Sequence, residues 1–218
     1  MNGDVTPGYA SPACALHQTD PAYSGLPPDV AAWRRGARER LLAWRTALPI
    51  AERAGMTERI VAGLEALAAT LNTAGAPIVS AYWPFRGEPD LRPWLLAMIA
   101  RGFRAALPIV VAKGAPLAFR LWTPETPLTR GVWDIPIPAE GEYVEPAVVV
   151  APLVGFDAAG YRLGYGGGFY DRTLAALTGP RLAIGVGYAA CELATIHPQP
   201  HDVPMALIVT EGGMRSPG

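Results

Sequence analysis

The sequence predicts an α/β fold in three layers, a mainly parallel sheet with helices on both of its faces, in a single domain. Strand-like apolar stretches alternate with helical patterns and are joined by short connections, which is the pattern of this fold class. The stretch 147–152 is apolar without interruption, as expected for a strand that is buried on both faces. With 218 residues, of which 50% are hydrophobic, the chain is long enough to form one substantial core.

The first helix is predicted over residues 33–48, where apolar side chains recur every three or four positions and Asp29 can cap the start. Three arginines of this helix lie off its apolar face: Arg34, Arg38 and Arg45. Further helices are predicted over 57–71, over 90–101 and from the end of the glycine-rich loop to residue 177. Strands are predicted over 77–83, 103–111, 117–122, 147–152, 182–186 and 206–210. Residues 1–29 are expected to form a mobile N-terminal arm, 30–213 the α/β domain, and 214–218 a tail.

Composition narrows the possible partners and the location. The net charge of −1 provides no basic field for nucleic acid or an anionic membrane. The two cysteines are far apart and indicate neither a zinc site nor a disulfide framework. No apolar run reaches about 18 residues, and no signal peptide is recognisable at the N-terminus. We therefore expect a cytoplasmic monomer that acts on small molecules.

A glycine-rich loop carries the strongest functional signal: Arg162-Leu-Gly-Tyr-Gly-Gly-Gly-Phe-Tyr-Asp171. Glycines allow backbone N–H groups to turn toward an anion, and a helix that begins directly afterwards adds its positive dipole end. Asp171 suits a metal ion that a phosphate carries. The loop therefore predicts a nucleotide and Mg²⁺ site, although it is not a Walker A motif. The alternative is an ordinary glycine-rich turn between two elements.

The longer stretch Val154-Gly-Phe-Asp-x-x-Gly-Tyr-Arg-Leu-Gly-Tyr-Gly-Gly-Gly-Phe-Tyr-Asp-Arg172 resembles the signature of the 5-formyltetrahydrofolate cyclo-ligase family, also called methenyltetrahydrofolate synthetases. The resemblance extends from about Trp33 to Glu211 and includes three shorter motifs in the family's order: Arg86-Gly-Glu-Pro-Asp90, Trp133-Asp-Ile-Pro136 and Pro200-His-Asp-Val-Pro204. It implies a ligase of one-carbon metabolism that uses ATP as co-substrate and Mg²⁺ as cofactor. The reaction it implies closes 5-formyltetrahydrofolate to 5,10-methenyltetrahydrofolate and releases ADP and phosphate.

The resemblance also implies roles for individual residues. ATP is expected to bind Arg34, Arg38, Arg162, Leu163, Gly164, Tyr165, Gly166, Gly167, Gly168, Phe169 and Tyr170, of which Arg162 and Tyr170 are the expected catalytic residues. The folate is expected to contact Trp83, Glu88, Trp133, Tyr165 and Phe169, and Mg²⁺ is expected to bind Asp171 and Asp202. A carboxylate such as Glu88 can accept hydrogen bonds from the donor edge of a pterin ring, as carboxylates do from guanidinium. Because ligands bind at the carboxyl ends of parallel strands, the 86–90 segment and the glycine-rich loop are expected to share one crevice.

Each of these assignments has a simpler alternative. Arg34 and Arg38 can be solvated charges, and Arg35 is a rival for one of their positions in the alignment. The chain also departs from the family in two ways: it has arginine where lysine is common, and its glycine-rich loop is neutral where that of some relatives is basic. Glu88 can be an exposed acid on a loop tip. A zinc site at His197 and His201 is disfavoured, because Pro198 and Pro200 prevent the helix that this spacing needs. The glycines of the 185–190 segment are interpreted as close-packing positions rather than as a dinucleotide fingerprint.

Two other functions remain open from the sequence. The chain can be a non-catalytic relative of the cyclo-ligases that binds nucleotide or folate as a regulator. It can also be a kinase or ligase for another small acid on the same fold.

Overall fold

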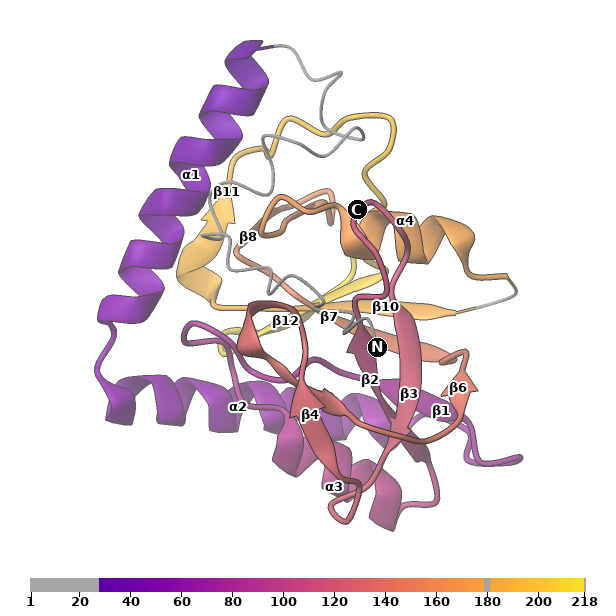
Figure 1. The fold of residues 1–218 in the computed structure, drawn as a ribbon. Helices are drawn as coiled ribbons and strands as arrows, with labels where there is room; N and C mark the ends of the chain where they lie inside the picture. Colours follow the sequence, from indigo (N-terminus) through magenta and orange to yellow (C-terminus); the bar gives the residue numbers. More distant parts are fainter. Residues whose placement is uncertain (1–27, 179–180, 218) are drawn as a thin grey trace, which may run out of the picture.

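The computed structural model describes residues 28–178 and 181–217; most of the expected arm over residues 1–29 therefore lies outside the described residues. Within them a central sheet of eight strands has the order β13-β12-β10-β7-β1-β2-β3-β6 (Figure 1). The strands are, in that order, Gly213–Arg215, Leu207–Thr210, Leu182–Val186, Val148–Pro152, Ile78–Ser80, Arg104–Ile109, Ala118–Trp122 and Tyr143–Val144. The five strands from β12 to β2 run parallel, and β13, β3 and β6 add antiparallel edges. The predicted mainly parallel sheet is confirmed.

Helices cover both faces of the sheet, as the sequence predicts (Figure 1). β7 shows why: Val148 and Val150 pack into the core cluster of α2 (Ile50–Ala68) and α3 (Arg92–Ala100), whereas Val149 packs on the other face against α4 (Phe169–Ala176). A strand with apolar residues at every position can be buried on both sides only between two such layers. The three-layer αβα prediction is therefore correct.

The first helix, α1 (Pro28–Ala47), stands beside the sheet and not flat on it (Figure 1). Its buried Ala37 packs against Leu163 and Ile196, which belong to a smaller sheet and the loop that follows it. α1 ends at Ala47, and Pro49 is the N-cap residue of α2, which begins at Ile50, seven residues before the predicted start at Thr57. A proline is tolerated at a helix start, so the two helices follow each other with almost no connection.

Several short strands were not predicted. β8 (Gly155–Asp157), β9 (Arg162–Leu163) and β11 (Glu192–Leu193) form a three-stranded sheet that holds the start of the glycine-rich loop. β4 (Leu128–Arg130) and β5 (Pro136–Pro138) form a separate two-stranded ribbon. Two or three residues are too few to show an alternating pattern, so the sequence carries no periodic signal for them. At the C-terminus, β13 carries the chain past residue 213 as an ordered edge strand.

Gly185, inside β10, and Gly187, directly after it, confirm the close-packing interpretation. A Cβ atom added at Gly185 would lie 2.9 Å from Ile208 and from Leu153, and one added at Gly187 would lie 2.9 Å from Leu153. No helix of the kind that a dinucleotide fingerprint requires follows, only a 3₁₀ turn over Ala189–Cys191. Among the described residues, no helix is long and apolar enough to cross a membrane.

Replacing Gly185 with alanine is expected to lower the free energy of unfolding by about 1 kcal/mol, the low end for an overpacked core. The effect stays small because the clashing atoms are the ends of side chains that can shift. Gly212→Ala is the matched control, since its added Cβ would meet nothing closer than 3.5 Å. Urea denaturation of both variants measures the difference, and equal stabilities would contradict the packing argument.

Candidate active site

One pocket forms at the carboxyl ends of β1, β2 and β7 and is closed by the glycine-rich loop. Tyr82, Trp83, Phe85 and Glu88 reach it from the segment after β1, and the loop contributes Arg162 and residues 164–171. A third wall comes from the segment 132–137 around the 3₁₀ turn η3 (Val132–Asp134). The 86–90 segment and the glycine-rich loop therefore share one crevice, as the strand-end rule predicts.

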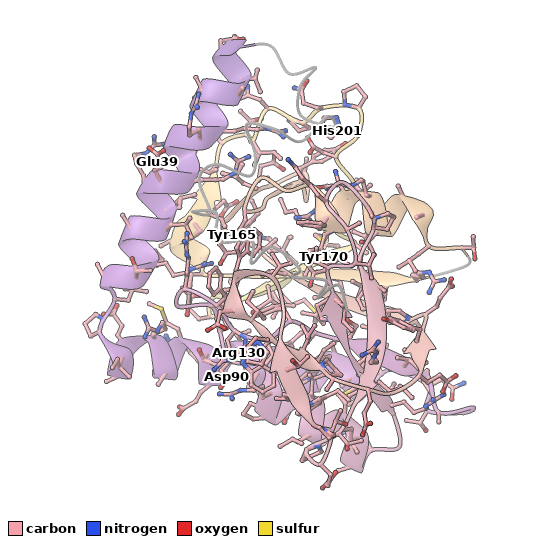
Figure 2. The ribbon with its side chains drawn as sticks, viewed as in Figure 1. Glu39, Asp90, Arg130, Tyr165, Tyr170 and His201 are labelled. Atoms are coloured by element: carbon pink, nitrogen blue, oxygen red, sulfur yellow. The ribbon has the colours of Figure 1, made fainter. Side chains whose placement is uncertain are left out.

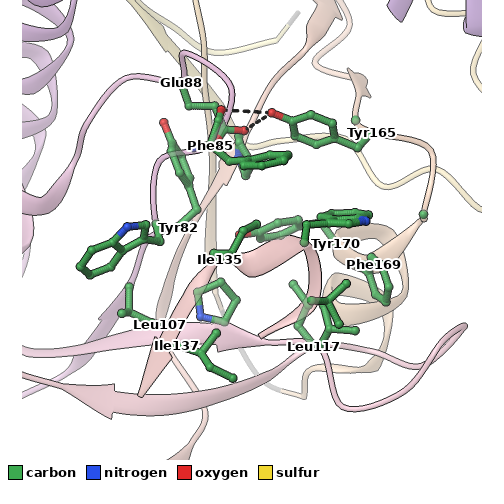
Figure 3. A pocket seen from close by; sticks show the side chains of 18 of the residues that line it. Tyr82, Phe85, Glu88, Leu107, Leu117, Ile135, Ile137, Tyr165, Phe169 and Tyr170 are labelled. Atoms are coloured by element: carbon green, nitrogen blue, oxygen red, sulfur yellow. Dashed lines mark hydrogen bonds between the residues drawn. The ribbon is translucent and has the colours of Figure 1, made fainter. Parts of the chain in front are cut away.

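Glu88 lies at one end of this pocket as a buried acid (Figure 3). Its Oε2 accepts a hydrogen bond from the backbone N–H of Phe85 at 2.8 Å, and its Oε1 accepts one from the Tyr165 hydroxyl at 2.8 Å. Burial raises the pKa of Glu88 to about 7, against the lowering effects of the Arg45 charge and of these two hydrogen bonds. The acid is not an exposed loop tip, so that alternative is wrong.

Flat aromatic side chains line the pocket next to Glu88. The rings of Phe85 and Trp133 are stacked, with centroids 6.1 Å apart and planes 8° from parallel, and Tyr165 is tilted against both. Trp133 has a left-handed backbone with φ of 58°, a strained conformation of the kind that collects at functional sites. Its buried indole N–H has no partner within the described protein. Trp83 also lines the pocket, between Trp122 and the Arg92 guanidinium.

The glycine-rich loop owes its shape to residues without side chains. Gly166 and Gly168 have φ values of 98° and 62°, which favour glycine, and Gly168 immediately precedes α4. A Cβ atom at Gly164 would lie 2.8 Å from the Arg162 guanidinium, and one at Gly167 would lie 2.7 Å from the Phe169 ring. The loop thus folds tightly over its own charged and aromatic residues and directs α4 at the pocket.

Arg162 and Asp171 are buried at the two ends of this loop, and the partly buried Tyr170 lies against Arg162. The Arg162 guanidinium donates to the Asp171 carboxylate at 2.6 Å and lies 5.3 Å from the centre of the Tyr170 ring. The Nε of Arg162 and the hydroxyl of Tyr170 are buried and have no hydrogen-bond partner among the residues that the structure describes. Unsatisfied buried polar atoms are rare in folded proteins, so both are candidates for contact with a ligand. Figure 2 shows Tyr165 and Tyr170 in the interior, and Glu39 on the outer side of α1.

Four of the residues expected at the nucleotide or metal do not line the pocket: Arg34, Arg38, Leu163 and Asp202. Leu163 packs into the cluster beneath α1. Arg38 donates from its Nε to the carbonyl of Gly164 at 2.8 Å, so it holds the glycine-rich loop from outside. Neither arginine is a solvated surface charge, because both are buried.

Arg34 is bound to the loop that precedes β12. Its guanidinium donates to the carbonyls of Ile196 and His197 and to both carboxylate oxygens of Asp202, the shorter contact being 2.5 Å. The two side chains are 2% and 3% exposed. Asp202 also accepts from the N–H of Gln199, so the pair ties α1 to the 196–202 loop.

Comparison with known proteins agrees with this geometry. The profile of the 5-formyltetrahydrofolate cyclo-ligase family matches residues 30–211. The chain belongs to this family. A 5-formyltetrahydrofolate cyclo-ligase of Mycolicibacterium smegmatis is 33% identical over 183 residues, 79% of this chain and 91% of the relative, and the one of Escherichia coli K12 is 35% identical over 62% and 78%. The solved 5,10-methenyltetrahydrofolate synthetase of Aquifex aeolicus superposes with a TM-score of 0.71 at 29% identity, covering 84% of this chain and 92% of that one.

Among the described residues, no group of three or more His, Cys, Asp or Glu side chains can hold a metal ion. Mg²⁺ needs fewer, since it is commonly bound by one or two carboxylates together with substrate phosphates and water. Asp171 lines the pocket, and to bind the ion it would have to share its carboxylate with Arg162, which donates to it at 2.6 Å. Its Oδ1 accepts from the N–H of Val203 at 3.3 Å, so Asp171 and the residue after Asp202 are in contact despite their distance in sequence. Asp202 would have to share its carboxylate with Arg34.

One member of the site was missed in the sequence. Arg45 is 1% exposed, and its guanidinium lies behind Glu88 and Tyr165. The available signal was its helical phase: it follows Arg38 by seven residues, so both project from the same face of α1 as Arg34. Of these three arginines, Arg34 and Arg38 were interpreted as phosphate ligands or solvated charges and Arg45 was given no role, whereas each of the three has a buried partner elsewhere in the fold.

Proposed function

We propose that the chain catalyses the ATP- and Mg²⁺-dependent cyclisation of 5-formyltetrahydrofolate to 5,10-methenyltetrahydrofolate with release of ADP and phosphate. The observation that carries the proposal is the composition of the single pocket described above. A buried carboxylate flanked by stacked aromatic rings faces one part of it, and a glycine-rich loop with a buried arginine closes the other. A flat heterocycle with a donor edge suits the first part, and a phosphate chain suits the second.

The chemistry needs both parts. A formamide oxygen is a poor leaving group. The attack of this oxygen on the γ-phosphorus of ATP releases ADP and leaves the formyl carbon bearing a phosphate group. N10 of the folate then attacks the formyl carbon and loses its proton, and phosphate leaves from that carbon. Transfer of this kind depends on positioning and on neutralising charge more than on covalent catalysis.

The chain's own residues are assigned accordingly. Glu88 orients the pterin edge, Phe85 and Trp133 with Tyr165 restrict the plane of the ring, and the loop N–H groups with Arg162 receive the phosphate. Tyr170, whose ring lies beside the Arg162 guanidinium, is a neutral hydrogen-bond donor, since burial raises its pKa far above its usual value. Asp171, with Asp202, would hold Mg²⁺, which when bound neutralises charge on the transferring phosphoryl group.

Turnover tests the proposal. The protein is mixed with 5-formyltetrahydrofolate, ATP and MgCl₂, and methenyl absorbance is followed beside ADP release. We expect product only when ATP is present, with one ADP for each methenyl group. Calorimetric binding of ATP and folate without product would instead identify a binding-only relative, and ADP release without methenyl absorbance would identify a kinase for another acid.

A further inference from the structure

Arg45 joins three segments of the pocket from behind. It lies near the C-terminal end of α1, and its Nε donates to the carbonyl of Arg86 at 3.0 Å. One terminal nitrogen donates to the carbonyl of Leu153, after β7, at 3.2 Å, and the other donates to the hydroxyl of Tyr165 at 2.5 Å. The side chain therefore fixes the Glu88 segment, the end of a central strand and the glycine-rich loop relative to one another.

Tyr165 lies between this arginine and Glu88. Its hydroxyl accepts from Arg45. The same hydroxyl donates to Oε1 of Glu88 at 2.8 Å (Figure 3). The guanidinium itself stays 3.9 Å from the same oxygen, which is too far for a hydrogen bond. The phenol thus connects Arg45 to Glu88 by two hydrogen bonds, and the arginine does not contact the carboxylate directly. The remaining lone pairs of Glu88 stay available to a ligand.

Among the described residues, the other groups that face Glu88 carry no positive charge that could stabilise its carboxylate. These groups include Tyr82, after β1, and Tyr170, of α4. Burial is the largest cause that raises the pKa of each phenol, and the Glu88 charge is the second, so both phenols stay neutral near pH 7. The Phe85 N–H contributes one hydrogen bond. Arg45 is the cation that opposes the burial cost of the Glu88 charge, and that cost is large for an acid inside an apolar pocket.

We infer that Arg45 is a positioning residue that acts through Tyr165 to keep Glu88 ionised and oriented toward a ligand with an N–H donor edge. The inference rests on the proposed function only for the identity of that ligand. It also makes the glycine-rich loop part of the folate pocket, since Tyr165 belongs to that loop and supplies the link. Neither α1 nor Arg45 lines the pocket directly, so the effect has to be indirect.

The test compares Arg45→Met with Arg45→Lys and with Arg40→Met, an exposed arginine of the same helix. Titration of the ¹³C-labelled Glu88 carboxyl in the ligand-free protein, assigned with Glu88→Gln, gives the first readout. Arg45→Met removes the cation that opposes the burial cost and leaves only the Tyr165 and Phe85 hydrogen bonds to lower the pKa, so the Glu88 midpoint is expected to rise by at least about one pH unit. Calorimetry with 5-formyltetrahydrofolate from pH 6 to 9 gives the second readout. Affinity at pH 7 should fall at least about fivefold and recover at higher pH, because the carboxylate is the binding form and a one-unit rise from about 7 lowers its ionised fraction from about a half to about a tenth.

The controls separate the possible outcomes. Arg40→Met should leave both curves unchanged, and Arg45→Lys should restore part of the shift, since it returns the charge without the planar fork. If Arg45→Met does not fold, Tyr165→Phe, which removes the linking hydroxyl, should move the Glu88 midpoint in the same direction. An unmoved midpoint in every folded variant overturns the inference, as does an affinity loss that is equal at all pH values. A wild-type protein that binds no folate while the midpoint still moves refutes the proposed function alone.

Discussion

Replacing Asp202 with asparagine is expected to lower the free energy of unfolding by about 3–5 kcal/mol, because the change leaves the buried Arg34 guanidinium without a counter-charge. The size and shape of the side chain are nearly preserved, but one of its two acceptor oxygens becomes an NH₂ donor, so the loss reports on the charge and its hydrogen bonds rather than on packing. Both members of the pair are almost fully inaccessible to solvent, so water cannot replace the missing carboxylate. Urea denaturation in Mg²⁺-free buffer measures the effect.

The matched control is Asp134→Asn, which breaks the Arg130–Asp134 pair on the surface, where the side chains are 67% and 77% exposed. That pair should contribute less than about 1 kcal/mol. The metal-free buffer also separates the two roles of Asp202, since the loss of a pure metal ligand leaves the metal-free protein as stable as before. An unchanged unfolding midpoint, combined with weaker stabilisation by Mg²⁺ and ATP, would return Asp202 to the metal-ligand assignment.

The fold and the general place of the site were predictable because they depend on patterns that are local in the sequence. The uninterrupted apolar stretch of β7 required cover on both faces, and the structure provides it with Val149 on one side and Val150 on the other. Because such strands run parallel in one sheet, their carboxyl ends lie together at one edge of that sheet. The rule that ligands bind there placed Glu88 and the glycine-rich loop in one pocket, although 77 residues separate Glu88 from Tyr165.

The partners of the buried arginines were not predictable, because each pair is created by tertiary structure. Arg34 and Asp202 are 168 residues apart, and nothing in either segment identifies the other. An arginine at helical spacing carries the same local signal whether it meets solvent, a phosphate or a buried carboxylate. Arg45 illustrates the same limit, since only the folded protein brings it behind Tyr165.

Replacing Glu88 with glutamine is expected to lower folate affinity by about tenfold to over a hundredfold and to leave ATP affinity nearly unchanged. The amide keeps the size of the side chain, and its oxygen can still accept from the Phe85 N–H while its NH₂ group donates to the Tyr165 hydroxyl. It loses the negative charge, and one pterin N–H then meets a donor instead of an acceptor. Hydrogen bonds to charged groups contribute roughly 1.5–3 kcal/mol, which gives this range of affinities. Isothermal titration of 5-formyltetrahydrofolate and of ATP measures both.

Glu142→Gln is the matched control, because Glu142 is 66% exposed and pairs with Arg104 at the start of β2, the end of that strand opposite to the pocket. Above pH 7 the difference between wild type and Glu88→Gln should be largest, since Glu88 ionises as the pH rises through about 7 and glutamine does not titrate. Below pH 6 the two proteins should converge, because the protonated acid, like the amide, is neutral. Equal weakening of ATP and folate binding would contradict the placement of the pterin at Glu88, and a difference that does not depend on pH would contradict its role as a charged acceptor.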